Sequence, residues 1–167
     1  CWFGSDGTSH RKLLLDAVSE CRAALGRTHF PSNRHGTYRV DAAIRTDVEL
    51  FEWHVDQAAR QEGATALERY RAALDLVTGR PFTYPNASRR SFGWVDYEHH
   101  ATTWEHKVTN VAKAFTELCL DLGRHEEAID LIRRLLQAIP LSGDLVAALM
   151  RTHLATGDRP AAEALYQ

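Results

Sequence analysis

A regular spacing of glycine and alanine near the end of the chain constrains its fold more than any other sequence feature. Gly123 and Gly157 lie 34 positions apart (157 − 123), and Ala128 and Ala162 repeat the same interval (162 − 128). The glycine ends a helix in a tight turn, and the small alanine lets the next helix approach closely. Pro140 closes the first unit because proline cannot continue a helix. The spacing therefore predicts repeated helix–turn–helix units.

Apolar residues at intervals of three and four extend the helical pattern over most of the chain. After Asp41 we predict only helices and turns, with Gly79 as the stop of the second helix and an irregular stretch from about residue 80 to 93. A 34-residue helical period is the tetratricopeptide spacing, and such pairs stack into a solenoid. The predicted fold is mainly α, with at least three tetratricopeptide-like stacked helix pairs. The predicted helices cover residues 46–58, 64–77, 95–122, 126–138, 143–155 and 159–166.

The opening part of the chain has a different pattern. Apolar spacing predicts a helix from Ser9 to Leu25, with Gly26 as its left-handed stop. Two β-prone runs, Thr28–Phe30 and Thr37–Val40, then flank a polar loop that contains glycine and proline, which indicates a β-hairpin. We therefore divide the chain into residues 1–43 and residues 44–167.

Composition and charge fit a globular protein with one basic part. The chain is 44% hydrophobic and 25% charged, and its apolar runs are too short to span a membrane. Its net charge of −2 divides into +3 for residues 1–40 and −5 for residues 41–167, so a contact with nucleic acid is expected only in the first part. Three scattered cysteines do not make a disulfide framework, and we expect a reducing, cytoplasmic compartment.

Several segments of the helical region resemble a known family. Tyr70–Phe82, with its Thr78-Gly79-Arg80-Pro81-Phe82 end, is similar to the bacterial transcriptional activator domain, as are Leu122–Ala128 and Leu149–Gly157. This domain is the tetratricopeptide-like module of the antibiotic-regulatory-protein group of bacterial activators. The resemblance covers about residues 44–167.

In that family a winged helix-turn-helix of the response-regulator type precedes the helical module. Leu13–Gly26 resembles its recognition helix, and Gly36–Val40 resembles the end of its wing. The first half of a winged domain is missing, so we expect this chain to be a piece of a longer protein. The family's recognition helix is rich in arginine where this chain has Ser19-Glu20-Cys21-Arg22-Ala23. A glutamate repels phosphate, and lost arginines remove contacts that read bases.

The resemblance implies two surfaces that bind partners. We expect the basic residues of the helix and the hairpin to contact DNA phosphates or an adjacent minor groove. We also expect a concave face of the helix pairs to bind a protein partner or a second copy. The DNA candidates are Arg11, Lys12, Arg22, Arg34 and Arg39. The candidates for the partner face are Glu126, Asp130, Arg133, Arg134 and Arg151.

Catalysis and metal binding find no support in the sequence. His99 and His106 lie near one face of a predicted helix, but no His-Glu-x-x-His motif is present. No phosphate loop or nucleophile motif occurs, so we predict no enzyme activity, no metal and no cofactor. We interpret the large aromatic residues as helix packing rather than as a ligand cage. They are Trp2, Trp53, Trp94, Trp104, Tyr70 and Phe115.

Two functions remain open at this level. The first is a fragment of a bacterial transcriptional regulator whose helical module mediates protein–protein interaction or dimerisation beside a DNA-binding winged helix. The alternative is a protein-interaction scaffold of a larger membrane-attached protein that does not bind DNA, as in the branch of large actinobacterial membrane proteins with peptidoglycan-binding-type repeats. The basic excess of residues 1–40 favours the first function, and Glu20 favours the second.

Overall fold

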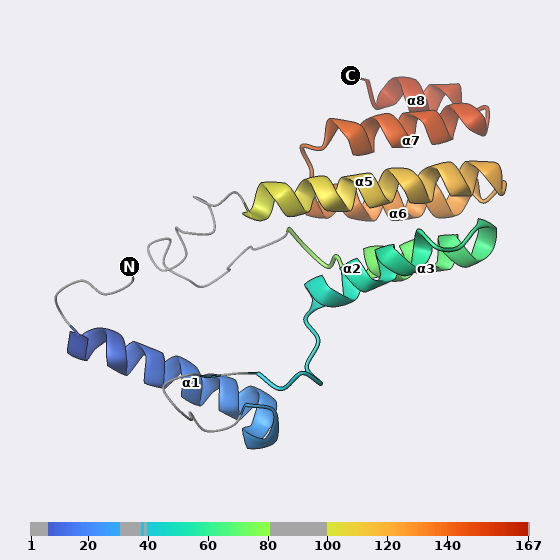
Figure 1. Cartoon of the computed structure of the whole chain (residues 1–167). Helices are drawn as coiled ribbons and strands as arrows, with labels where there is room; N and C mark the ends of the chain where they lie inside the picture. Colours follow the sequence, from blue (N-terminus) through green and yellow to red (C-terminus); the bar gives the residue numbers. More distant parts are fainter. Residues whose placement is uncertain (1–6, 31–37, 39, 81–99, 167) are drawn as a thin grey trace. The chain divides into compact units, whose positions relative to one another are not determined.

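The computed structural model describes residues 7–30, 38, 40–80 and 100–166. The chain divides into two compact units, residues 1–46 and residues 47–167, which we describe separately. The boundary lies three residues beyond the one that the sequence predicts. Figure 1 shows α1 (Gly7–His29) in the first unit, in blue, and stacked helices in the second.

The described part of the first unit contains the helix α1, which bends at Gly26. Gly26 has a φ of 78° and a ψ of 161°, so the helix breaks at the predicted glycine with a positive φ, but the ψ is extended and not left-handed helical. The expected strand at Thr28–Phe30 is wrong for Thr28 and His29, because a further helical turn follows the break and Phe30 N–H donates to the Gly26 carbonyl at 3.0 Å. The loop of the expected hairpin lies outside the described residues, so the hairpin stays a prediction.

The second unit consists of helices joined by short turns, as the apolar pattern predicts. Within the described residues they form three pairs, α2 with α3, α5 with α6 and α7 with α8, stacked one on the next (Figure 1). Their bounds lie within a few residues of the expected ones. The helices are α2 (Asp47–Ala58), α3 (Gly63–Asp75), α5 (His100–Asp121), α6 (His125–Ala138), α7 (Gly143–Ala155) and α8 (Arg159–Ala164).

The 34-residue period appears as two turns of the same geometry. Gly123 has a φ of 69° and Gly157 a φ of 79°. The residue after each glycine donates its N–H to a carbonyl in the last turn of the preceding helix, from Arg124 to Cys119 at 2.8 Å and from Asp158 to His153 at 2.9 Å. This 6→1 hydrogen bond, together with a left-handed glycine, is the Schellman motif that ends a helix. The predicted helix–turn–helix repeat is confirmed.

Gly79 does not have the role that the sequence predicts for it. Helix α3 ends at Asp75, and its C-cap residue Leu76 keeps a right-handed conformation. Gly79 is also absent from the glycines of positive φ. Helix α3 therefore ends without a left-handed glycine, because the N–H groups of Leu76 and Val77 close the last turn onto the carbonyls of Ala73 and Leu74, both at 3.2 Å.

One hydrophobic core runs through the stacked pairs. Phe115 of α5 is fully buried in this core, together with leucine and isoleucine side chains of α3, α6 and α7. Ala128 and Ala162, the alanines of the sequence repeat, are 0% and 2% exposed. Their small side chains allow the close approach of paired helices that the repeat requires. The buried set includes Leu67, Leu74, Ile132, Leu135 and Leu145.

Candidate functional site

Arg22, one of the residues expected to contact DNA, is bound within the first unit. Its Nε donates to the Phe30 carbonyl at 3.2 Å, and its guanidinium lies 5.9 Å from the Phe30 ring centroid and 6.0 Å from that of Tyr38. The two rings stack with centroids 6.1 Å apart. Arg22 therefore fastens the end of α1 to the following chain by a hydrogen bond and cation–π contacts.

The structure describes only some of the other basic side chains of the first unit. Lys12 is exposed on α1, whereas the side chain of Arg11 and the whole of Arg34 and Arg39 lie outside the described residues. Arg27 is exposed in the last turn of α1 and was not among the sequence candidates. It shares a shallow hollow with Arg22 and Ser19, which makes it a further candidate for phosphate contact. The hollow is lined by Leu15, Val18, Ser19, Arg22, Ala23 and Arg27.

The residues expected on a partner face do not form a single surface. Glu126, Asp130 and Arg133 are exposed on α6. Arg134 of α6 instead reaches α3, where its Nη2 lies 2.5 Å from the Asp75 carboxylate. Arg151 lies on α7, and its ion pair is with a residue of α5. The structure therefore places only the first three together on a free face of α6.

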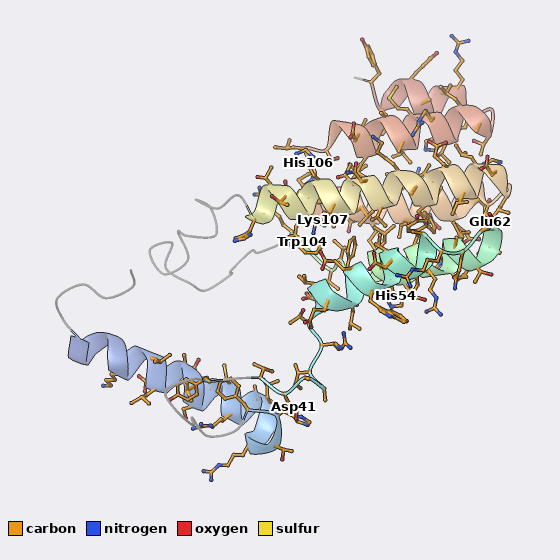
Figure 2. The ribbon with its side chains drawn as sticks, viewed as in Figure 1. Asp41, His54, Glu62, Trp104, His106 and Lys107 are labelled. Atoms are coloured by element: carbon orange, nitrogen blue, oxygen red, sulfur yellow. The ribbon has the colours of Figure 1, made fainter. Side chains whose placement is uncertain are left out.

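Ion pairs link the first helices of successive pairs. Glu52 of α2 lies 2.7 Å from Lys107 of α5, and Lys113 of α5 lies 3.4 Å from Asp144 of α7. Arg151 of α7 pairs with Glu117 of α5 at 2.8 Å. Each pair is about half exposed and contributes roughly 0–1 kcal/mol. Figure 2 shows Lys107 beside Trp104 on α5, and the Lys107 ammonium lies 4.4 Å from the Trp104 ring centroid.

A denser charge cluster joins α3 to the turn between α5 and α6. Arg124 contacts Glu68 at 3.2 Å and also pairs with Glu127, while Arg71 pairs with Glu127 and lies 3.8 Å from Glu68. Two guanidinium groups thus neutralise two carboxylates in a half-buried position. The Arg71 guanidinium also lies 5.5 Å from the ring centroid of Phe115. This cluster was not predicted from the sequence, although Arg124 and Glu127 have the spacing of a helical ion pair.

Two titratable side chains beside these clusters have shifted pKa values. Burial raises the pKa of the Cys119 thiol to about 11, against the opposing effect of Arg124 and Arg71. The thiol is therefore protonated at neutral pH, and a protonated thiol is neither a nucleophile nor a metal ligand. Burial, with a smaller effect of Arg69, lowers the pKa of His54. Among the described residues no group of three or more potential ligands is arranged to bind a metal ion.

The aromatic residues that the structure describes follow the packing interpretation. The Trp104 ring meets Phe51 edge-on with centroids 5.7 Å apart, and Phe115 is fully buried. Trp53 of α2 is 44% exposed and so is not a core residue, but it contacts the next helix, because the Arg69 guanidinium of α3 lies 5.3 Å from its ring centroid. The Trp53 ring also meets the ring of His54 edge-on, with centroids 4.8 Å apart. Trp2 and Trp94 lie outside the described residues.

The helical unit matches a known protein family almost from end to end. A comparison with protein families aligns residues 46–167 with the bacterial transcriptional activator domain. The chain belongs to this family. The bacterial transcriptional activator domain is a regulatory module and not an enzyme family. Searches of curated proteins and of solved structures found no match. In the described part of the chain no helix is both long and apolar enough to cross a membrane.

Proposed function

We propose that this chain is part of a bacterial transcriptional regulator. Its activator domain mediates protein–protein interaction or dimerisation, and residues 1–43 form part of a DNA-binding winged helix beside it. The family match over residues 46–167 carries this proposal. The basic balance of residues 1–40 supports contact with DNA, since positive charge draws a protein to the phosphate backbone.

The two units differ in the sign of their net charge. The first unit carries the basic excess, and its exposed Lys12 and Arg27 are available on α1 for phosphate contact. The activator domain carries a net charge of −5, which opposes contact with DNA. The proposal therefore assigns DNA to the first unit and protein partners to the second.

An electrophoretic mobility shift assay with the intact parent protein tests the DNA-binding role. We expect binding to duplex DNA at low salt, with a linear fall of log affinity against log salt. The double variant Lys12→Ala, Arg27→Ala should weaken binding and reduce the salt slope by about one per lost phosphate contact. Arg133→Ala removes an exposed charge from α6 and serves as the matched control. A lack of binding at low salt would refute the proposal.

One observation favours the alternative, a scaffold domain of a larger membrane-attached protein without DNA binding. Glu20 is exposed near the middle of α1, and Arg22 is held by Phe30 and Tyr38. Both reduce the positive charge that α1 offers to a phosphate. In the mobility shift assay this alternative predicts no shift, whereas Glu20→Ala would strengthen binding by a true DNA reader.

A further inference from the structure

Helix α7 has an apolar face that no other described element covers. Gly143, Ala147 and Leu154 are exposed on it, and Val146 and Met150 are half buried at its edge. Leu154 is 56% exposed, and Leu141 in the turn before α7 is 97% exposed. A helix in a monomeric protein usually turns charged residues to solvent. The absence of charge along this line sets α7 apart from α6, whose free face is polar.

The order of small and large residues on this face makes it complementary to itself. Gly143 and Ala147 come first, and Met150 and Leu154 follow. Gly143 and Leu154 are equally far from the midpoint between Ala148 and Leu149, and so are Ala147 and Met150. If two copies of α7 pack antiparallel about a twofold axis at this midpoint, Leu154 of one copy meets Gly143 of the other, and Met150 meets Ala147.

The space at the first of these contacts is open. A side chain added at Gly143 would meet no atom within 4 Å. The open surface at Gly143 therefore leaves room for the Leu154 side chain of a second copy, and the exposed Leu141 lies close to Gly143 in the sequence. Large side chains that meet small ones allow two helices to approach closely.

Charge complementarity supports the same arrangement. Asp144 and Arg151 both lie on the border of α7 that faces α5, where they pair with Lys113 and Glu117. A twofold axis across two antiparallel helices keeps this border of one copy beside the same border of the other. Arg151 then lies within about 3 Å, along the axis, of Asp144 in the second copy, since a helix rises about 1.5 Å per residue. Two opposite-charge contacts thus flank the apolar centre symmetrically.

We propose that the exposed face of α7 is a homodimer interface in which two copies pack antiparallel about the Ala148–Leu149 midpoint. This inference rests on the interaction role proposed above for the activator domain, and it names a second copy as the partner. The contact is isologous, so it closes at two copies and does not propagate into a fibre. One helix pair buries less than a standard interface, so the dimer is weak and depends on concentration.

Sedimentation equilibrium of the full chain over a range of concentrations tests the proposal. We expect a mass that rises from monomer to dimer and no further. Leu154→Asp should weaken dimerisation about tenfold or more, because it places a charge in the apolar contact. Leu122→Asp, at another exposed leucine, is the matched control and should leave the mass curve unchanged. A monomer at all concentrations, or a dimer that Leu154→Asp does not affect, would overturn the interface.

Disulfide trapping tests the antiparallel register directly. In a background where Cys1 and Cys21 are replaced by serine, Ala147→Cys and Met150→Cys are prepared as two separate proteins. Cys119 is fully buried and can remain. Random pairing of an equimolar mixture already gives the mixed disulfide at twice the yield of either homodimer. The register predicts a clearly larger share of the mixed disulfide than this statistical share, and a yield at or below the statistical share would contradict it.

The outcome is independent of the DNA-binding test. A monomeric chain that still shifts DNA would remove the α7 interface and leave the regulator proposal in place. A protein that dimerises through α7 but does not bind DNA would keep the α7 interface and remove the regulator proposal.

Discussion

The two left-handed glycines provide the sharpest test of the repeat. Gly123 and Gly157 have φ values of 69° and 79°, and an added Cβ would meet no atom within 4 Å at either position. An alanine there is therefore disfavoured by its own backbone and not by a clash with neighbours. The left-handed conformation costs alanine about 1–2 kcal/mol, and the loss of chain entropy in the unfolded state offsets about 0.4–1 kcal/mol of this.

Gly123→Ala and Gly157→Ala should thus each lower the free energy of unfolding by about 1 kcal/mol. Gly143→Ala is the matched control, because Gly143 lies in α7 without a positive φ and also has open space around it. That substitution should leave stability unchanged or raise it by up to about 1 kcal/mol. The measurement uses dilute protein, so that self-association through α7 does not contribute to the free energy of unfolding.

Urea unfolding followed by circular dichroism at the helix band measures these differences. The two turn variants should unfold at lower urea than the wild type, and the control at equal or higher urea. If Gly123→Ala and Gly157→Ala are as stable as Gly143→Ala, the turns do not adopt the left-handed conformation, and the physical reasoning behind the 34-residue repeat is wrong.

Three further predictions concern the core and the titratable groups. Phe115→Ala should lower the free energy of unfolding by about 3–5 kcal/mol, as measured by urea unfolding, because it empties the centre of the core. NMR titration should give His54 a pKa below that of a free histidine, and Arg69→Ala should raise this pKa. Because the folded state binds a proton at His54 more weakly than the unfolded state does, His54 makes the fold less stable as the pH falls. A thiol reagent at neutral pH should label Cys21 at once and Cys119 only after unfolding, because the pKa of the buried thiol is raised to about 11.

The features that the sequence predicts well are those with a local cause. The turns at Gly123 and Gly157 follow from the conformation that glycine alone adopts freely, and the helix pairs follow from apolar residues at helical intervals. The same reasoning failed at Gly79 and at Thr28, where β-prone or turn-forming residues were outweighed by the continuation or early end of a helix. Residue preference is a weak guide when the neighbouring turn already fixes the backbone.

The features that could not be predicted from the sequence depend on contacts between distant segments. Arg22 was expected to face DNA, but its guanidinium finds Phe30 and Tyr38, which come later in the chain. The cluster around Arg124 joins residues of α3 and α6 that are more than fifty positions apart. Trp53 has a large apolar side chain of the kind usually found in a core, yet its position on α2 leaves it 44% exposed. No local pattern contains this information.

The stacking of the helix pairs can be measured by carbodiimide cross-linking followed by mass spectrometry. The reagent joins a lysine to a carboxylate that touches it, and Lys107 and Lys113 are two of only three lysines in the chain. The structure predicts a Glu52–Lys107 link between α2 and α5 and a Lys113–Asp144 link between α5 and α7. Links from these lysines only to acids of α5 itself, or to acids elsewhere in the chain, would contradict the stacked arrangement.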